Sequence, residues 1–147
     1  MDEVDIVTGE IEINRLIDSI KDPECGGLVV FLGTVRNHSE AGRVKELEYE
    51  AYEEMAKKKM SEISNQAKEK WPVKKVAILH RKGRLKIGDI SVAVGVSSPH
   101  RKEAFEACRY IIDSVKGEVP IWKKERLADG GERWVEEEAA NRKTKGE

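Results

Sequence analysis

A run of five consecutive apolar residues, Leu28–Leu32, constrains the fold of this chain more than any other feature of its sequence. The run is rich in strand-favouring residues and stands between Gly26-Gly27 and the segment Gly33–Arg36. Continuous apolar runs of this length are typical of strands that are covered on both faces. We therefore expect a buried central strand whose end presents a basic side chain, Arg36.

Periodic patterns on both sides of this run predict a mixed order of strands and helices. The expected order is strand, helix, strand, strand, helix, strand, strand, helix, strand, strand, with elements at residues 4–8, 13–20, 28–32, 44–51, 53–71, 73–80, 89–97, 98–116, 119–125 and 133–135. Hairpins mixed with crossover helices predict an α+β fold, with a largely antiparallel sheet, three helices and a C-terminal β-hairpin.

Three local features add detail to the expected fold. The alternation of apolar residues slips by one position between Val44 and Leu47, which predicts a β-bulge. Ser98 followed by Pro99 is typical of a helix start, with Ser98 as the N-cap. Trp122 and Trp134 are expected to pack against each other across the C-terminal hairpin.

Length and composition indicate one domain. With 147 residues the chain can bury a sizeable core, and we expect a domain over residues 1–136 and a charged, partly disordered tail over residues 137–147. Charged residues make up 37% of the chain but cancel to a net charge of −1, so a polyanion would have to be recognised by a local patch. Cys25 and Cys108 are far apart and are expected to be reduced and structural.

The sequence also bears on the compartment. No apolar stretch approaches the roughly 18 residues that a membrane span needs. The acidic start Met1-Asp2-Glu3 is unlike a signal peptide. We expect a cytoplasmic protein without a membrane segment.

Basic residues stand where the predicted elements end, which is where binding groups concentrate. These residues are Arg36, His100, Arg101, Lys116, Lys123 and Lys124. The turn from Ser98 to Arg101 opens a helix and could bind an anion, although ordinary capping and surface charge are the favoured explanation from the residues alone. His80 is interpreted as a hydrogen-bonded structural residue. From the residues alone, the expectation is an anion-binding α+β domain.

Several sequence blocks, taken together, resemble the large, catalytic subunit of molybdopterin synthase. They are Gly26–His38, Leu47–Tyr52, His80–Gly83, Ser98–Arg101 and Lys116–Glu125, the last reading KGEVPIWKKE. The blocks occur in the order of that family and extend over about residues 4–135. The resemblance implies an α/β-hammerhead-like fold.

The resemblance implies a sulfurtransferase of molybdenum cofactor biosynthesis. Such an enzyme converts cyclic pyranopterin monophosphate (precursor Z) to molybdopterin by adding two sulfurs as a dithiolene. The sulfur donor would be the C-terminal Gly-Gly thiocarboxylate of a small ubiquitin-like subunit. A homodimer of large subunits would carry one small subunit at each end, giving a heterotetramer, and the step would need no metal or other cofactor.

The resemblance also assigns residues. Arg36, His100 and Arg101 match positions that hold the phosphate and pterin of the substrate, and Thr34 and Val35 line the same loop. Lys116 matches the catalytic lysine. Lys123 matches a second essential lysine, with Lys124 and Glu125 beside it as substrate contacts. The acidic Glu136–Glu138 stands where a basic contribution to the neighbouring protomer's site would be expected, and Arg142 or Lys143 could replace it.

Two other functions stay open at this point. One is a non-catalytic module that binds an anion, a nucleotide or RNA through Lys57–Lys59 and Lys123–Arg126, although a near-zero net charge and few aromatic residues are untypical of such modules. The other is a scaffold that only assembles the small subunit. Intact Lys116 and Lys123 count against a scaffold.

Overall fold

The structure, a computed structural model, describes residues 2–135, so the predicted domain boundary at residue 136 and the predicted tail lie outside the described residues. Its elements are β1 (Glu3–Val7), α1 (Ile13–Ile20), β2 (Gly27–Thr34), β3 (His38–Ser39), β4 (Gly42–Ala51), α2 (Glu53–Lys70), β5 (Lys75–Arg81), β6 (Gly83–Lys86), β7 (Ile90–Ser98), α3 (Arg101–Glu118), β8 (Ile121–Leu127) and β9 (Glu132–Val135). This order confirms the predicted α+β fold with three helices and a C-terminal hairpin.

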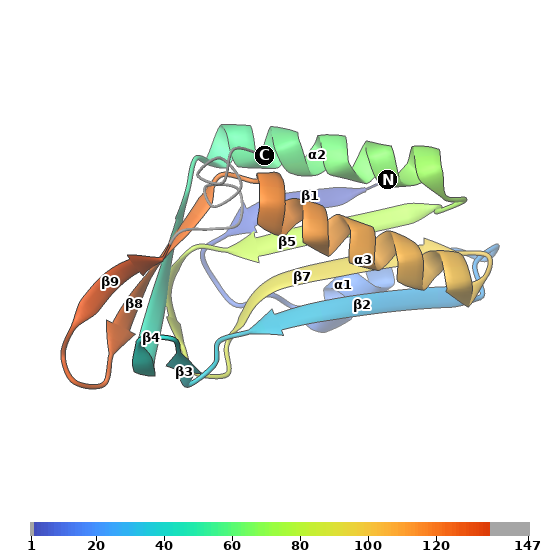
Figure 1. The fold of residues 1–147 in the computed structure, drawn as a ribbon. Coiled ribbons are helices and arrows are strands. Elements are labelled where there is room, and N and C mark those ends of the chain that lie inside the picture. The colour runs from blue at the N-terminus through green and yellow to red at the C-terminus, as the bar shows by residue number, and fades with distance from the viewer. Residues whose placement is uncertain (1, 136–147) are drawn as a thin grey trace.

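The first sheet has the strand order β1-β5-β7-β2, and its pairs are antiparallel except for β1 with β5. Helices α2 and α3 cover one face and α1 covers the other (Figure 1). Side chains alternate between the two faces, so Val94 and Val96 of β7 join the core under α2 and α3 while Ala93 joins the core under α1. At Gly95 the helix α1 lies so close that a Cβ atom would stand 2.9 Å from Leu16 Cδ2.

The second sheet has the strand order β3-β4-β8-β9, and β6 also pairs with β4. All its pairs are antiparallel. The register of β4 against β8 shifts between Val44 and Glu46, which confirms the predicted bulge. This sheet stands at the end of the molecule where α3 finishes, and β8 begins directly after α3 (Figure 1). It therefore brings β4 and β8 to the last turn of α3.

The expectation of a buried central strand at Leu28–Leu32 was wrong. Strand β2 lies at the edge of the first sheet and pairs only with β7 among the described residues. Leu28, Phe31 and Leu32 are 38%, 39% and 38% exposed. A sequence pattern reports apolar side chains, but the position of a strand in a sheet depends on pairings between distant segments.

The predicted helix start was also wrong. Strand β7 continues to Ser98, which pairs with Gly27, and the Ser98 hydroxyl donates to the carbonyl oxygen of Pro72 at 3.4 Å. The helix α3 starts two residues later, with His100 as an extended N-cap that makes no side-chain capping bond. Pairing with β2 extends β7 through the residues that local capping chemistry would have assigned to the helix.

The predicted contact between Trp122 and Trp134 is absent. Trp134 lies opposite Lys124 in the hairpin, and its ring centroid is 4.9 Å from Lys124 Nζ. Trp122 lies opposite Glu50 of β4, and its ring contacts that of Tyr52 edge-to-face at 5.3 Å. A shift of two residues in the register of β8 against β9 separates the two indoles.

Candidate functional site

Two of the lysines chosen from the sequence lie on elements that adjoin at the C-terminal end of α3. Lys116 lies in the last turn of α3, and Lys123 lies on β8 opposite Tyr49 of β4. Lys116 lines a small pocket together with Val115 of α3, residues of four strands and the α3–β8 connection. The other lining residues are Tyr49, His80, Val92, Val115, Val119 and Ile121. We refer to this as the lysine pocket.

The chain reverses sharply between the two lysines. The amide of Val119 donates to the carbonyl of Val115 at 3.2 Å, which ends α3, and the amide of Ile121 then donates to the carbonyl of Val119 at 2.9 Å as β8 begins. Val119 and Ile121 are buried in the core. The reversal is thus fixed by apolar anchors, and it places Lys116 and Lys123 on neighbouring elements.

His80 lies in the wall of the lysine pocket. It is 5% exposed, its Nδ1 atom is 3.0 Å from the carbonyl oxygen of Arg81, and its ring meets the Tyr49 ring edge-to-face at 5.0 Å. Burial lowers the pKa of His80 to about 4, the bond to Arg81 opposes this shift, and the positive charges of Lys116 and Lys123 add to it. Both lysines therefore act on the same imidazole.

Sequence reasoning assigned His80 only a structural hydrogen bond, and that bond is present. It did not connect His80 with the two lysines, because the connection depends on how β4, β5, β8 and α3 pack. A histidine at the end of an apolar strand was the one signal the sequence offered.

The loop after β2 lies beside the β6–β7 turn. The amide of Val35 donates to the carbonyl of Asp89 at 3.0 Å, and the amide of Gly88 donates to the carbonyl of Val35 at 2.9 Å. Val35 is buried in the core, whereas Thr34 and Arg36 are exposed. Since α3 packs on β2 and β7 and both β2 and α3 end on this side, Arg36 and Lys116 belong to the same end of the molecule (Figure 1).

Strand β8 presents its charged residues on two faces, because successive side chains of a strand alternate. Glu125 is 4% exposed, accepts a hydrogen bond from Ser39 Oγ at 2.9 Å and pairs with Arg133 Nε at 2.7 Å. Glu125 thus ties β3, which follows the Arg36 loop, to the hairpin. Lys124 faces the opposite way, over the Trp134 ring.

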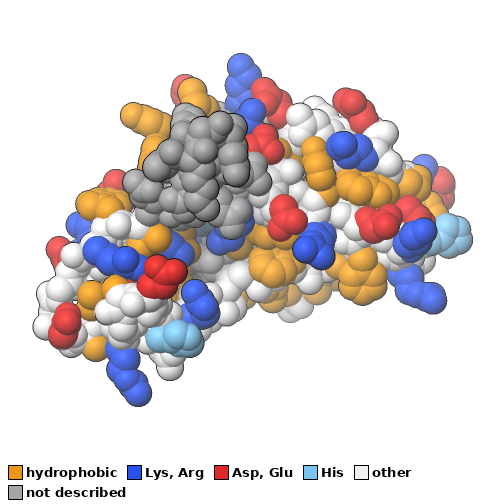
Figure 2. Space-filling model, viewed as in Figure 1, with side chains coloured by type: hydrophobic (Ala, Val, Ile, Leu, Met, Phe, Trp, Pro, Cys, Tyr) orange, Lys and Arg blue, Asp and Glu red, His pale blue; other side chains and the backbone are white. Residues whose placement is uncertain are grey.

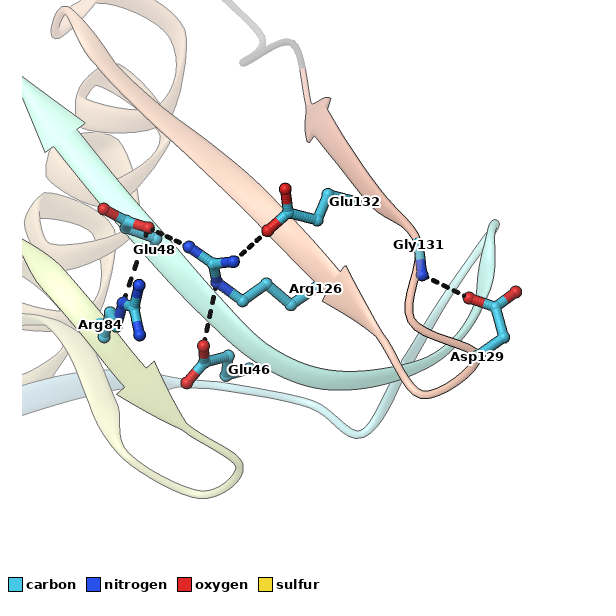
Figure 3. A network of polar contacts seen from close by, with 7 residues as sticks. All are labelled: Glu46, Glu48, Arg84, Arg126, Asp129, Gly131 and Glu132. Atoms are coloured by element: carbon cyan, nitrogen blue, oxygen red, sulfur yellow. Dashed lines mark hydrogen bonds and ion pairs between the residues drawn. The ribbon is translucent and has the colours of Figure 1, made fainter.

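The Lys124 face of this sheet also holds a network of ion pairs around Arg126 (Figure 3). The guanidinium of Arg126 contacts Glu46 at 2.9 Å and Glu48 at 2.8 Å, and it also bonds Glu132. Arg126 holds the pKa of Glu48 below its ordinary value. The network joins β4, β8 and β9, and its carboxylates neutralise Arg126.

His100 and Arg101 lie at the other end of α3. Both are exposed, and the turn packs against β2, since a Cβ atom on Gly27 would stand 3.0 Å from the amide nitrogen of Arg101. Arg101 and Lys116 are fifteen residues apart on one helix, which at 1.5 Å per residue separates their backbones by about 22 Å. Within one protomer the structure does not bring His100 and Arg101 to the lysine pocket.

Other features of the described residues bear on the chemistry. A hollow of about 500 Å³ lies beside β1 and is lined by five carboxylate residues and one arginine, so it is unsuited to an anion. On the face shown in Figure 2, Lys and Arg side chains are interspersed with Asp and Glu.

Within residues 2–135 no group of three or more His, Cys, Asp or Glu side chains is arranged to hold a metal ion. None of the described helices is long and apolar enough to cross a membrane.

The chain matches a known protein family, named relatives and solved structures. The profile of a family described as MoaE protein matches residues 6–118. The molybdopterin synthase catalytic subunit of Halalkalibacterium halodurans is 46% identical over 130 residues, which cover 88% of this chain and 83% of that protein. A crystal structure of molybdopterin synthase from Staphylococcus aureus matches with a TM-score of 0.87 and 42% identity, covering 92% of this chain and 98% of that one.

A third match, at 22% identity, is informative for the fold. It is a complex of subunits 1 and 2 of molybdopterin-converting factor from Helicobacter pylori, with a TM-score of 0.74 over 92% of this chain and 90% of that one. The fold described above is therefore shared with proteins of widely different sequence.

Proposed function

The chain belongs to the MoaE family, the molybdopterin synthase catalytic subunits, and on this premise we propose that it converts cyclic pyranopterin monophosphate to molybdopterin. The reaction adds two sulfurs to the pterin as a dithiolene, and the sulfur comes from the C-terminal thiocarboxylate of a small ubiquitin-like subunit. The observation that carries the proposal is that Lys116 lines the pocket whose wall holds His80, while Lys123 lies on the adjoining strand β8, directly opposite Tyr49 of the same wall.

The charges of the lysine pocket suit this chemistry. The thiocarboxylate and the cyclic phosphate are both anions, and they repel each other unless cations lie between them. Lys116 and Lys123 supply two positive charges beside a buried wall, where electrostatic attraction is stronger than in water. Their position at the junction of α3 and β8 leaves the segment between them as one wall for an extended peptide tail.

We assign the two lysines different roles. Lys116 holds the incoming thiocarboxylate or, as its neutral amine, transiently bonds the terminal carbonyl carbon of the donor. In the second case the carbon–sulfur bond breaks and the sulfur leaves toward the pterin as hydrosulfide, carrying the proton that the amine gives up. Lys123 stabilises the negative charge that develops as the cyclic phosphate opens. Arg36 and Thr34, exposed on the neighbouring loop, bind the phosphate and pterin, and Glu125 supports that loop through Ser39.

The partner in this proposal is the small ubiquitin-like subunit whose C-terminal Gly-Gly carries the thiocarboxylate. The matching Helicobacter pylori structure is a complex of two subunits of molybdopterin-converting factor, which supports a two-subunit assembly here. An extended tail can add to exposed strand backbone, and among the described residues β9 pairs with β8 only from Lys123 onwards, which leaves the edge of β8 open at Ile121 and Trp122, beside the lysine pocket. We expect the assembly to act in the cytoplasm.

A second copy of the chain completes the site in this proposal. Among residues 2–135, strand β2 is paired along one edge only, and it exposes three apolar side chains, Leu28, Phe31 and Leu32. If two β2 edges pair antiparallel about a two-fold axis, the Gly27 end of one strand meets the Thr34 end of the other. His100 and Arg101 of one protomer then approach Arg36 and Lys116 of its partner, and two small subunits complete a heterotetramer.

The alternative of a nucleotide- or RNA-binding module is not favoured. Lys57 pairs with Asp5 at 3.2 Å, and Lys59 lies 3.6 Å from Glu62 and 3.9 Å from Glu118, so two of the three lysines of that patch are neutralised. Arg126 is neutralised by three carboxylates. A polyanion would have to displace these carboxylates.

Reconstitution tests the proposal directly. The purified chain, a thiocarboxylated small subunit and precursor Z are mixed, and the dithiolene product is detected after oxidation to a fluorescent pterin. The wild-type chain and the control variant Lys58→Ala, which changes an exposed residue of α2, should form product, whereas Lys116→Ala should form none. Failure of the wild-type chain to form product, or substantial turnover by Lys116→Ala, contradicts the proposal.

A further inference from the structure

The backbone on both sides of Arg36 is fixed by hydrogen bonds. The amide of Val35 donates to the carbonyl of Asp89 at 3.0 Å, and the carbonyl of Val35 accepts from the amide of Gly88 at 2.9 Å. On the other side, the carbonyl of Asn37 accepts from an amide of β4 at 2.9 Å. The side chain of Arg36 is exposed, so this loop presents a guanidinium to solvent from a backbone that is held in place.

The β6–β7 turn, to which Val35 bonds, is closed by the side chain of Asp89. Asp89 Oδ2 accepts a hydrogen bond from the Lys86 amide at 2.8 Å, and the Asp89 amide donates to the Lys86 carbonyl at 3.0 Å. Gly88 lies between these residues with a φ of 89°, a conformation that other residues rarely adopt. The carboxylate thus holds the turn that supplies both bonding groups for Val35, the Gly88 amide and the Asp89 carbonyl.

A second contact of Asp89 joins this turn to the strand that carries His80. Asp89 Oδ2 lies 3.6 Å from Nη1 of Arg81, the last residue of β5, whose side chain is 16% exposed. The Nε atom of Arg81 is buried and has no hydrogen-bond partner among the described residues, so this guanidinium depends on the charge of Asp89. One carboxylate therefore connects the wall of the lysine pocket with the turn that holds the Arg36 loop.

Resting on the proposed function, we propose that Asp89 is a positioning residue for the binding of the substrate phosphate by Arg36. Through the β6–β7 turn its carboxylate fixes the backbone of Val35, and with it the point from which the Arg36 side chain reaches the phosphate. A long side chain loses less freedom on binding when its backbone is already in place. In this role Asp89 acts through Arg36 and does not contact the substrate.

The pairing with Arg81 makes a carboxylate compatible with this place. An uncompensated negative charge near Arg36 would oppose the binding of a phosphate. Because Arg81 lies on the same oxygen that accepts from the Lys86 amide, the charge of Asp89 is offset where the turn is closed.

A double-mutant cycle separates this role from a general structural one, because residues that act through one contact are not additive. Arg36→Ala should raise KM for precursor Z roughly tenfold to hundredfold, the range for losing a hydrogen bond between charged groups. Asp89→Ala should raise KM roughly threefold to tenfold with a smaller change in kcat, because the contact is misplaced and not removed. In the Arg36→Ala background, Asp89→Ala should change KM by less than about twofold.

Two results of this cycle overturn the proposal. One is an unchanged KM in Asp89→Ala. The other is the same rise in KM in both backgrounds, because Asp89 then acts independently of Arg36. If Asp89→Ala does not fold, the cycle is run with Asp89→Asn, which keeps an acceptor for the Lys86 amide but loses the charge that faces Arg81, and the same two results decide.

The matched control is Asp129→Ala. Asp129 Oδ1 accepts from the Gly131 amide at 2.8 Å and closes the β8–β9 turn in the same manner, on the other hairpin (Figure 3). Asp129→Ala should keep the wild-type KM. A rise in KM equal to that of Asp89→Ala overturns the proposal, because loosening any turn would then have the same effect.

A second measurement does not depend on turnover. Amide hydrogen exchange of Val35 and Gly88 is followed in the intact chain. Exchange of both amides should be at least roughly threefold faster in Asp89→Ala and unchanged in Asp129→Ala. Wild-type protection of both amides in Asp89→Ala overturns the proposal. If the wild-type chain forms no product in reconstitution, the proposed function fails, and exchange still decides whether Asp89 holds the Arg36 loop.

Discussion

The two ends of α3 carry basic residues in opposite surroundings. At the C-terminal end, Lys116 lines a pocket whose wall holds the buried residues His80 and Tyr49, and Lys123 lies on the adjoining strand. At the N-terminal end, His100 and Arg101 are exposed on a turn that makes no side-chain capping bond. The first end is organised by its own chain, whereas the second can be organised by another molecule.

This difference separates the two parts of the proposed reaction. Groups that act on the reacting atoms benefit from a fixed, partly dry environment, because they need not reorganise as charge develops. Groups that only bind phosphate work at an exposed helix start, where backbone amides and the helix dipole favour anions. The lysine end therefore suits chemistry and the arginine end suits binding.

Substitution of Lys123, beside the C-terminal end of α3, should lower turnover more than substitution of Arg101 at the other end. Lys123→Ala removes a charge beside the lysine pocket and should lower kcat at least roughly a hundredfold, the usual effect of removing one group that stabilises a developing charge. Lys58→Ala is the control, because Lys58 is an exposed lysine of α2 that has no place in the proposed site. Similar losses in the two variants would show that the pocket-facing lysine has no special role.

The neutral state of His80 predicts a specific acid sensitivity. Unfolded histidine has a pKa near 6.5, so between pH 6.5 and about 4 the unfolded chain binds a proton that the folded chain excludes. The stability that neutral His80 confers is complete above pH 6.5 and is lost as the pH falls toward 4. Each pKa unit corresponds to about 1.4 kcal/mol, so the full loss amounts to about 3 kcal/mol.

Urea unfolding at pH 7 and pH 4.5 checks this prediction. The wild-type chain should lose more stability between the two pH values than His80→Gln, which carries no titrating ring. The same pH dependence in both chains would show that His80 does not titrate as described.

Substitution of Glu125 should lower the free energy of unfolding more than substitution of its neighbours on β8. Glu125→Ala leaves Ser39 and Arg133 without their acceptor and should lower the free energy of unfolding by about 2 kcal/mol. Glu125→Gln keeps an acceptor and should cost less. Urea unfolding at neutral pH measures both variants, and equal stability of Glu125→Ala and the wild type would contradict the internal role of this carboxylate.

Removal of the Arg101 side chain should have the smallest effect on activity. It should weaken substrate binding rather than slow the reaction. Arg101→Ala should raise KM for the pterin phosphate roughly tenfold with a smaller change in kcat, because a charge-assisted contact to phosphate contributes mainly to binding. Its melting temperature should match the wild type, since the side chain is exposed. A large fall in kcat at unchanged KM would place Arg101 among the reacting groups instead.

The order of elements could be predicted from the sequence because helical and strand periods are local properties. The bulge at Val44 and the C-terminal hairpin were predicted for the same reason. The edge position of β2 and the extension of β7 to Ser98 could not be predicted, because both depend on pairing between β2 and β7.

The candidate site was predictable residue by residue but not as an arrangement. Lys116 and Lys123 were chosen as a pair and lie near one imidazole, whereas the contribution of His80 to the pocket required the tertiary packing of four elements. The distance between Arg101 and Lys116 could be predicted from the sequence. Fifteen residues on one predicted helix separate their backbones by about 22 Å. The functional roles of all these residues stay predictions.

Mixing two inactive variants tests most directly whether the two ends of α3 serve one site across two protomers. Lys116→Ala and Arg101→Glu, a charge reversal chosen to abolish phosphate binding, are unfolded together, refolded together and assayed for sulfur transfer. In a mixed dimer one site carries both substitutions and the other carries neither, so about a quarter of the wild-type turnover should return. Turnover no greater than the sum of the separate variants would contradict the account, because it would place both residues in the same protomer's site or in no shared site.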